Sequence, residues 1–387
     1  MSDVQHNPAE EPIKSPGQSL PGQVVLVLPG GGALGSYQVG VYQALHEAGI
    51  EPDWVIGTSI GAINASLIAG NRPEHRLSRL REFWKRMEQR PLWAFADAWP
   101  ELHDKVSYWS TVSHGIPGFF KPNTLAHAGA EYPLGPEQAG YYSTGPLEQT
   151  LRELVDFSLL NRGSPRLTVG AAHVRSSRMR YFDSRDSQLD VRHVMASGAL
   201  PPAFPPVRIE GELYWDGGIL SNSPTEAVFD DNPRKNSLIF AVQMWNPVGT
   251  EPQTMADVFH RHKDMQYASR MSSQIARHQQ AHNLRHVIQQ LAARLPEADR
   301  DSAAVRELAG YGCATQMHVV RLLAPQLERE THTKDIDFSP SGIRQRWEAG
   351  HAHTKGVLAR TPWNGAFDPL SGVIVHEQVM DIPAAAE

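Results

Sequence analysis

The sequence is poor in features that mark secreted, membrane-spanning or nucleic-acid-binding proteins. Its 387 residues include one cysteine, Cys313, so no disulfide can form within the chain and a reducing compartment is favoured. The longest aliphatic run near the start, Val24–Leu28, is far shorter than the ~20 residues of a membrane-spanning helix. With 36 Lys and Arg against 42 Asp and Glu, the net charge is −6, which argues against nucleic acid as a partner.

Residues 1–20 also lack the basic segment and apolar run of a secretory signal peptide. They are polar and contain Pro8, Pro12 and Pro16, so we expect a flexible tail. The expected location is cytoplasmic, with peripheral contact at the inner membrane as a variant. Export by a route that needs no signal peptide stays open.

The first fifty residues after this tail alternate between strand and helix signals. Residues 24–28 form an unbroken β-favouring run, a glycine cluster follows at 30–35, and a helical pattern extends to about Ala48. A second short strand at 54–56 leads through a tight turn into a small-residue helix that ends near Ala69. This βαβα order predicts an α/β fold built on a parallel sheet.

Composition divides the rest of the chain into three parts. Residues 83–142 hold 12 of the 31 aromatic side chains, and we expect them to form a lid or cap that either packs as satellite core or binds an acyl chain. Residues 21–246 are expected to be the catalytic core that carries this cap. Residues 247–387 are expected to be a helical extension with one late strand, at 317–323, that joins the core, and the last twenty or so residues look irregular.

The pattern Gly57-Thr58-Ser59-Ile60-Gly61 is the first candidate site. A serine in a G-x-S-x-G pattern between a strand and a helix sits on a sharp turn that exposes its hydroxyl. The following helix adds its N-terminal dipole and the free amide of Ile60. Small residues often open helices by chance, so the pattern gains its weight from this strand-to-helix context.

The glycine cluster has two interpretations. Gly30, Gly32 and Gly35 fit G-x-G-x-x-G after a strand, which is typical of dinucleotide binding. That fingerprint needs an acidic residue at the end of the second strand, whereas Asp53 precedes that strand. The alternative is an oxyanion hole whose glycine amides face Ser59, because both loops leave the carboxyl ends of parallel strands.

Asp216-Gly217-Gly218 follows a strand-like segment and would place a carboxylate on an open loop, where it could act as a base. A histidine base is the alternative, and five of the 18 histidines follow Asp216 at suitable positions: His260, His262, His278, His282 and His286. The last three share a helix face, but no acidic or cysteine ligand lies near them, so we predict no metal site. Cys313 is expected to be a packed thiol.

Taken together, four ordered elements resemble the patatin-like phospholipase family, and in particular a bacterial subgroup with a C-terminal extension. The resemblance covers about residues 22–230 and is carried by these segments: Leu28 to Gly35, Gly57 to Gly61, Ala196 to Val207, and Asp216 to Gly218. One departure is Leu34, where many members carry Arg or Lys. That difference puts a preference for phospholipids in doubt.

The resemblance implies a three-layer α/β/α fold with a mainly parallel central sheet. It also implies a Ser–Asp dyad in which Ser59 is the nucleophile and Asp216 its base, acting on fatty acyl esters without a metal or cofactor. The implied oxyanion hole consists of the amides of Gly30, Gly31, Gly32 and Ile60. Neutral or short hydroxyacyl esters are the alternative substrates, and a lipid-binding protein without activity or a dinucleotide-binding protein are alternatives of other classes.

Overall fold

The computed structural model describes residues 20–377 apart from 90–114, 130, 328–329, 331 and 369. Nearly all of the predicted tail and a large part of the predicted aromatic cap therefore lie outside the described residues. The strands are β1 (Gln23–Leu28), β2 (Trp54–Thr58), β3 (Lys121–Pro122), β4 (Tyr142–Ser143), β5 (Arg166–His173), β6 (Arg178–Asp183), β7 (Val207–Ile209), β8 (Glu212–Asp216), β9 (Ser237–Gln243), β10 (Met317–Leu323) and β11 (Val373–His376). The helices are α1 (Gly35–Glu47), α2 (Ile60–Ala69), α3 (Pro73–Met87), α5 (Gly145–Leu154), α6 (Phe157–Leu160), α7 (Val191–Ser197), α8 (Glu226–Phe229), α9 (Met255–Arg294), α10 (Glu297–Arg300), α11 (Ala303–Ala309) and α12 (Pro340–Arg360).

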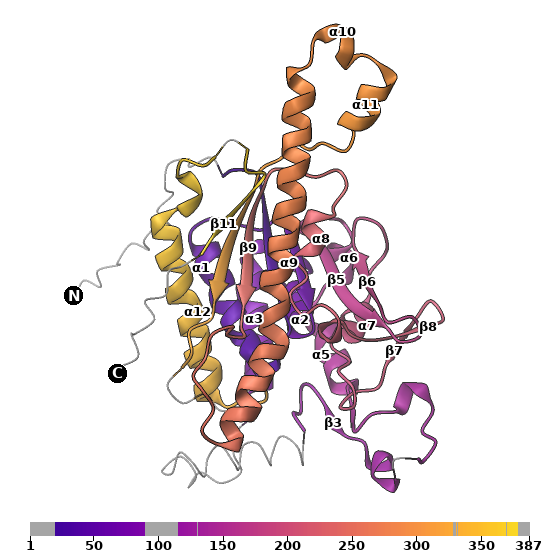
Figure 1. Ribbon diagram of the computed structural model, residues 1–387. Coiled ribbons are helices and arrows are strands. Elements are labelled where there is room, and N and C mark those ends of the chain that lie inside the picture. Colours follow the sequence, from indigo (N-terminus) through magenta and orange to yellow (C-terminus); the bar gives the residue numbers. More distant parts are fainter. Residues whose placement is uncertain are drawn as a thin grey trace, which may run out of the picture.

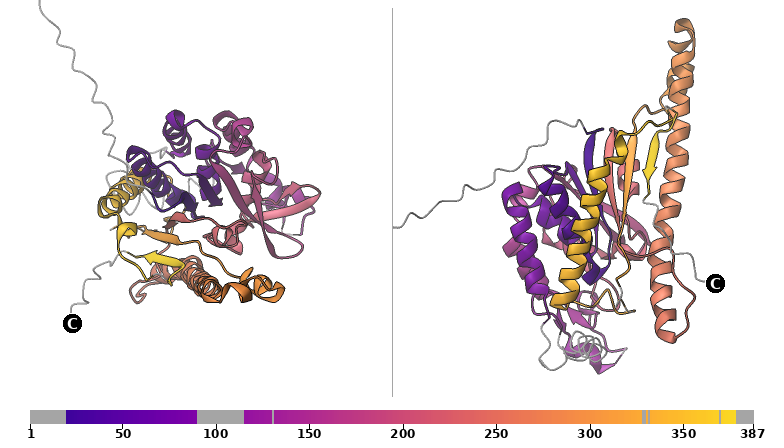
Figure 2. Two further views of the ribbon diagram at one scale, coloured as in Figure 1. Left: turned by 90° about the horizontal axis from the view of Figure 1, so that it is seen from above. Right: turned by 90° about the vertical axis from the view of Figure 1, so that its left-hand side faces the viewer.

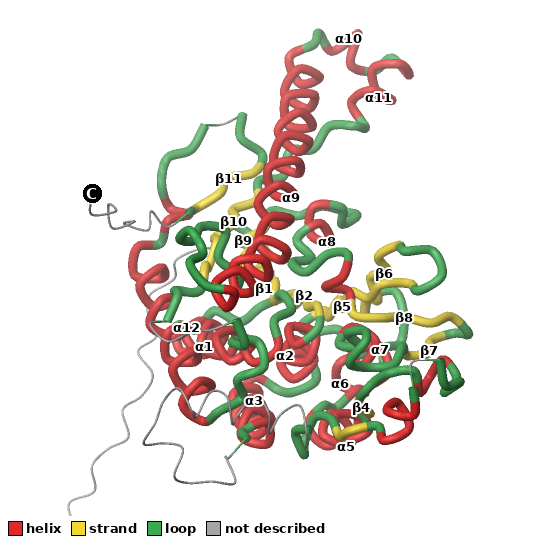
Figure 3. The backbone as a smooth tube through the Cα atoms, turned by 60° about the horizontal axis from the view of Figure 1, so that its bottom comes forward, coloured by secondary structure: helices red, strands yellow, loops and turns green. Residues whose placement is uncertain are grey.

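The main sheet runs in the order β11–β10–β9–β1–β2–β5–β8–β7, with β6 paired to β5 beside this path (Figure 3). From β11 to β5 every pair of neighbours is parallel, while β6 and β8 run antiparallel to β5. In the register of β1 and β2, Leu28 lies opposite Gly57. The loops that follow these two central strands therefore leave the same edge of the sheet side by side.

Both faces of the sheet are covered, as expected for central strands that are mostly apolar. Val24, Leu26 and Leu28 of β1 belong to a buried cluster that includes residues of α1, α2, α3 and α12. Val25 and Val27 belong to a second cluster with residues of α8 and α9. The sheet thus separates two helical layers (Figure 2), and the predicted three-layer α/β fold is confirmed.

The chain after β9 contributes two strands to the sheet, not one. β10 matches the predicted late strand, but β11 falls in the segment that we expected to be irregular. Its four residues are too few for a clear pattern, and their strand form comes from parallel pairing with β10. α12 packs on α1 so closely that a Cβ on Gly40 would lie 2.0 Å from the Trp347 carbonyl oxygen.

α9 is a 40-residue helix that begins at the edge where the parallel strands end (Figure 1). It runs along one face of the sheet and continues beyond the opposite edge, where α10 and α11 follow it (Figures 1 and 2). Within the described part of the chain, no helix combines the length and the apolarity needed to cross a membrane.

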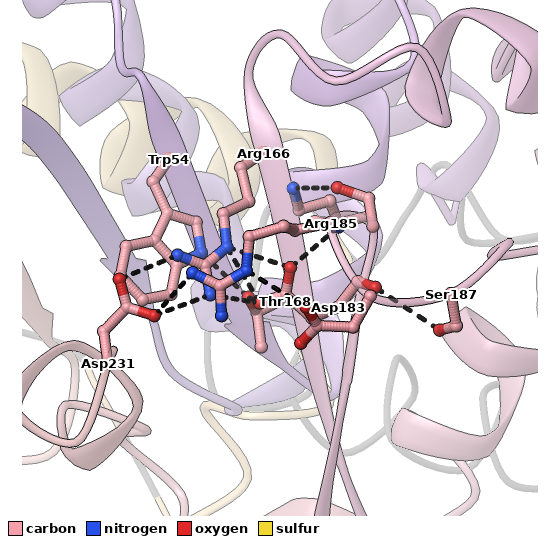
Figure 4. A network of polar contacts seen from close by, with 10 residues as sticks. Trp54, Arg166, Thr168, Asp183, Arg185, Ser187 and Asp231 are labelled. Carbon is pink, nitrogen blue, oxygen red and sulfur yellow. Dashed lines mark hydrogen bonds and ion pairs between the residues drawn. The ribbon is translucent and has the colours of Figure 1, made fainter. Parts of the chain in front are cut away.

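An ion-pair network ties the sheet together at the edge opposite the ends of the parallel strands (Figure 4). Trp54 and Arg166 are register partners at the starts of β2 and β5, and the guanidinium lies 3.6 Å from the centroid of the indole ring. Arg166 also binds Asp183 of β6 at 2.7 Å and Asp231, which follows α8, at 3.0 Å. Arg185 binds Asp231 at 2.8 Å. This cluster joins three strands and the α8–β9 connection.

Candidate active site

Ser59 lies between β2 and α2 in a strained conformation, with φ 56° and ψ −126°. A non-glycine residue keeps such a conformation only where its surroundings enforce it. Gly57 and Gly61 permit the turn, since a Cβ on Gly57 would lie 2.4 Å from the Gly61 carbonyl oxygen. A Cβ on Gly61 would lie 2.0 Å from the Leu28 carbonyl oxygen. The pattern therefore forms the sharp strand-to-helix turn that the sequence predicts.

A second serine fixes the backbone of this turn. The Ser59 N–H donates to both the side-chain and the carbonyl oxygen of Ser197, at 3.0 and 3.1 Å. The Ser197 hydroxyl in turn donates to the carbonyl oxygen of Gly170 at 2.6 Å. The end of α7 is thus joined to the serine turn and to β5. In the sequence, Ser197 is only one letter of a family segment, and its role depends on a contact across 138 residues.

Asp216 ends β8 and is buried, with 2% of its surface exposed, so it does not lie on the open loop that we expected. Pairing with Ala171 of β5 carries it into the sheet next to the serine turn. The Gly218 N–H donates to its Oδ1 at 2.7 Å. Burial raises the pKa of Asp216 to about 7, although the neighbouring Ser59 hydroxyl and the Gly218 amide favour the charged form.

In the glycine loop, residues 30–35, the Gly30 amide is hydrogen-bonded, whereas those of Gly31 and Gly32 have no acceptor among the described residues. The Gly30 N–H donates to the Asn222 carbonyl oxygen at 3.2 Å, and the Asn222 side chain donates back to the Gly30 carbonyl oxygen at 3.1 Å. The expectation that the Gly30 amide helps to form an oxyanion hole is therefore wrong, because that N–H is occupied. The amides of Gly31, Gly32 and Ile60 have no acceptor among the residues that the structure describes.

These groups surround one cavity of about 210 Å³. Ser59 and Asp216 border it together with Gly31, Gly32 and Ile60. The rest of the wall is mainly apolar and comes from three regions that lie far apart in the sequence: Phe119, Phe120 and Tyr142 of the predicted cap, Leu200 and Phe204 after α7, and Trp245, Tyr267, Ile336 and Phe338 from the later part of the chain. The sequence indicated the first group by its aromatic content but gave no signal for the last.

The alternative bases and ligands lie elsewhere. Among the described residues no histidine borders the cavity. His278 stacks on Phe229 with a ring separation of 4.9 Å, and the His282 ring binds the Thr315 carbonyl oxygen at 2.9 Å. The described part of the chain also shows no group of three His, Cys, Asp or Glu side chains placed to hold a metal ion. The face of α9 that carries these histidines thus packs against neighbouring parts of the fold, at Phe229 of α8 and at Thr315 before β10.

Comparison with known families adds an independent observation. Residues 26–229 match a family model described as patatin-like phospholipase. The chain belongs to this family. A second family model, described as patatin phospholipase, matches residues 265–370. The first match includes the glycine loop, so that loop belongs to the patatin-like core and the dinucleotide-binding alternative has no support. Asp53 also lies at the other edge of the sheet, where it accepts a hydrogen bond from Val24 N–H at 2.8 Å.

The lysophospholipases among the curated relatives are much longer proteins than this chain. Lysophospholipase nte1 of Aspergillus terreus is 33% identical over 201 residues, which cover 51% of this chain and 10% of the relative. Lysophospholipase NTE1 of Yarrowia lipolytica is 28% identical over 243 residues, or 62% of this chain and 14% of the relative. Triacylglycerol lipase ptl3 of Schizosaccharomyces pombe is 42% identical over 62 residues, which cover 16% of this chain and 13% of the relative. The matched segments therefore cover only about a tenth to a seventh of the full lengths of these relatives.

Solved structures show more distant similarity. VipD from Legionella pneumophila aligns with a TM-score of 0.38 and 16% identity, over 88% of this chain and 67% of that chain. Human GIVD cytosolic phospholipase A2 aligns with a TM-score of 0.33 and 12% identity, over 57% of this chain and 43% of that chain.

Proposed function

We propose that the protein is a serine acyl hydrolase that cleaves fatty acyl esters of lipids, in the class of phospholipase A and lysophospholipase. The observation that carries this proposal is that Ser59, Asp216 and three backbone amides, which have no acceptor among the described residues, line the same mainly apolar cavity. A strained serine, a buried carboxylate and unpaired N–H donors are costly in a folded protein, and together they supply a nucleophile, a base and an oxyanion hole.

In the proposed reaction the Asp216 carboxylate accepts the Ser59 hydroxyl proton while the serine oxygen attacks the ester carbonyl carbon. The negative charge that forms on the carbonyl oxygen accepts hydrogen bonds from the amides of Gly31, Gly32 and Ile60. When this intermediate collapses, the alcohol leaves with the proton from Asp216 and the acyl group stays on Ser59. Water then attacks the acyl-enzyme and loses a proton to Asp216. Asp216 returns this proton to the Ser59 oxygen as the acyl–serine bond breaks, and the fatty acid is released.

The pKa of about 7 suits Asp216 for both halves of this cycle. A base works best when its pKa lies near the working pH, because it can then take and return a proton with similar ease. A solvent-exposed aspartate with an ordinary pKa near 4 would accept the serine proton far less readily. Burial thus gives a single carboxyl the role that histidine fills in other serine hydrolases.

The apolar cavity favours apolar acyl chains, but it does not indicate which alcohol the ester carries. Leu34, which replaces the cation common in the family, is buried with 4% exposure. It borders a small second cavity that Lys334 and Arg346 also line. Lysophospholipids, diacyl phospholipids, triacylglycerols and short hydroxyacyl esters are therefore all to be compared as substrates.

Peripheral contact with a lipid surface is supported by apolar side chains near the start of α9. Met255, Val258, Phe259 and Met265 are 66%, 41%, 53% and 56% exposed, and they lie toward one side of the helix. The same helix sends Tyr267 into the cavity wall. A lipid surface that covers these side chains would lie at the edge of the sheet where Ser59 is found (Figure 1).

The first experiment is labelling with a serine-directed fluorophosphonate, read by intact mass and peptide mapping on wild type and Ser59→Ala. We expect one adduct on Ser59 that is lost in the variant. A lipid panel in detergent and in vesicles then identifies the ester that is cleaved. Folded wild-type protein that stays unlabelled both with and without vesicles would overturn the hydrolase proposal and favour a lipid-binding role.

A further inference from the structure

A short segment of the C-terminal region, residues 332–338, contacts the glycine loop directly. The Ala33 N–H donates to the carbonyl oxygen of Asp335 at 2.8 Å. Gly32, at φ 56°, packs so closely on the same carbonyl that a Cβ there would lie 2.2 Å from its oxygen. We call residues 332–338 the brace. Gly32 and Ala33 both contact the Asp335 carbonyl. The position of Asp335 therefore restricts the direction in which the amides of Gly31 and Gly32 point.

The brace is held by two ion pairs to consecutive residues of α9. The Lys263 ammonium lies 2.7 and 3.0 Å from the two carboxylate oxygens of Asp335 and also donates to the His332 carbonyl oxygen at 3.0 Å. The Lys334 ammonium lies 2.9 Å from Asp264 Oδ1, and both of these residues are buried with 4% exposure. Partners buried in this way hold a fixed geometry, because separating them leaves a charge without compensation.

The other side of the brace forms part of the cavity wall. Ile336 and Phe338 border the cavity. The Phe338 ring stacks on Trp84 of α3 with a centroid separation of 6.2 Å, and its backbone carbonyl accepts the Gln89 N–H at 2.9 Å. The seven residues of the brace therefore contact three parts of the site: the glycine loop, which would form the oxyanion hole, the cavity wall, and α3.

We propose that the brace positions the oxyanion loop, with Lys263 and Asp335 as its positioning residues, and that Ile336 helps to set acyl-chain preference. This inference rests on the proposed hydrolase function. Oxyanion donors act only when they point at the place where charge develops, and a shift of about 1 Å reduces the rate substantially. The C-terminal region is thus part of the catalytic unit, and its polar contact with the loop is made through the backbone carbonyl of Asp335.

The test compares Lys263→Met with Lys263→Arg and with Arg86→Met as a matched control. Lys263 and Arg86 are both 32% exposed and both bind acidic partners, but Arg86 pairs with Glu153 away from the glycine loop. The readouts are kcat and KM on a water-soluble nitrophenyl ester, the rate constant for fluorophosphonate labelling of Ser59, and the folded fraction from urea titration.

For Lys263→Met we expect kcat and the labelling rate to fall about 10- to 100-fold while KM changes less than about threefold, as removal of oxyanion stabilisation predicts. Lys263→Arg is expected to recover most of this loss, and Arg86→Met to change kcat less than about twofold. The pH dependence of kcat/KM is expected to keep its midpoint, because Asp216 is untouched. Combining Lys263→Met with Asp335→Asn is expected to cost no more than the larger single change.

Two outcomes separate this inference from the proposed function. An unlabelled wild type overturns the hydrolase itself. A labelled wild type with Lys263→Met reacting equally fast, or losing activity only in proportion to its unfolded fraction, overturns the brace alone. For acyl preference, Ile336→Ala is expected to shift the optimum toward longer chains, and an unchanged chain-length profile contradicts that part of the inference.

Discussion

Asp216 is ionised at a cost to the folded state. Its folded-state pKa is about 7, whereas the unfolded chain titrates near the ordinary value of 3.8. Between these values the folded protein binds a proton that the unfolded chain has released, so the free energy of unfolding decreases as pH rises from about 4 to 7. This direction is opposite to that of a salt-bridged carboxylate.

Asp216→Asn is therefore expected to be more stable than wild type at pH 8, by a few kcal/mol on the order implied by the pKa shift, and equally stable near pH 4. Urea titrations at both pH values measure this. Asp231→Asn is the matched control: burial opposes its ionisation, but Arg166 and Arg185 together lower the pKa of Asp231 below its ordinary value. Asp231→Asn is therefore expected to be less stable than wild type at pH 8. If both variants changed the free energy of unfolding in the same direction, the raised pKa of Asp216 would be contradicted.

The same carboxyl predicts the pH dependence of activity. Because the proposed reaction requires a charged Asp216 to accept the Ser59 proton, kcat/KM is expected to rise with pH along a limb of unit slope whose midpoint is near 7. Asp216→Asn is expected to lower kcat about 10²- to 10⁴-fold. Stopped assays on a soluble ester from pH 5 to 9 test both statements, and a midpoint near 4 would mean that another group is the base.

Single residues of the site were predictable where their chemistry is local. Ser59 and the glycines around it form one turn, and sequence spacing is enough to specify a turn. The engaged state of the Gly30 amide was not predictable, because its partner Asn222 lies 192 residues away. The burial of Asp216 likewise depends on strand pairing, which no short pattern around it encodes.

At the scale of elements, the Arg166 network holds strands that run in opposite directions. Asp183 and Asp231 are each 6% exposed and share the Arg166 guanidinium. Arg166→Ala leaves Asp183 without its guanidinium partner, leaves Asp231 with Arg185 alone, and removes the stacking on Trp54. We expect it to lower the free energy of unfolding by about 3–5 kcal/mol. Arg166→Lys is expected to recover only part of this, because an ammonium cannot bind both carboxylates in the bidentate geometry of a guanidinium.

Urea titration measures the Arg166 variants, and activity on a soluble ester supplies the control. The network lies at the opposite edge of the sheet from Ser59, so protein that remains folded is expected to keep nearly full kcat. A large loss of kcat without a loss of stability would show that the two edges are coupled.

The first turns of α9 offer a second prediction at this scale. In a Ser59→Ala background, which prevents hydrolysis, Met255→Asp with Met265→Asp is expected to lower binding to anionic phospholipid vesicles about tenfold or more, because two exposed apolar side chains no longer enter the lipid. Leu284→Asp with Leu291→Asp is the matched control on the distant half of the same helix, where both leucines are 59% exposed. If both double variants lost vesicle binding equally in sedimentation assays, the lipid contact would not be specific to the end of α9 near the cavity.

Most elements were predictable because strands such as β1 and β9 are continuous apolar runs and helices such as α1 end at glycine. β11 was not, since four residues with mixed burial acquire strand form only beside β10. The brace was also missed. It has no regular periodicity, and its importance comes from what lies against it.

At the scale of the whole molecule, the two regions that match separate family models build one sheet. β10 of the second region extends the parallel half that begins at β1, with β9 and β11, which lie outside both matched ranges, on either side of it. α12 of the second region packs along α1. Cleavage of the chain inside the second region, between α9 and β10, need not separate the two fragments. Trypsin cleavage at the exposed Arg300, beyond the edge of the sheet, is expected to leave a nicked protein that elutes as one species and labels on Ser59 at the wild-type rate. Dissociation of the fragments in gel filtration would contradict this.

The order of parts along the chain has a consequence for synthesis. A ribosome releases the glycine loop and Ser59 early, but β9 follows about 180 residues after β2, and Asp335, which supports the loop, emerges about 300 residues after the loop itself. Until then the nascent chain holds Ser59, but the amides proposed as oxyanion donors lack the contact that gives them a fixed direction. If the proposed hydrolase function holds, activity is therefore expected to appear only after the segment that carries Asp335 has been synthesised and has folded against the loop.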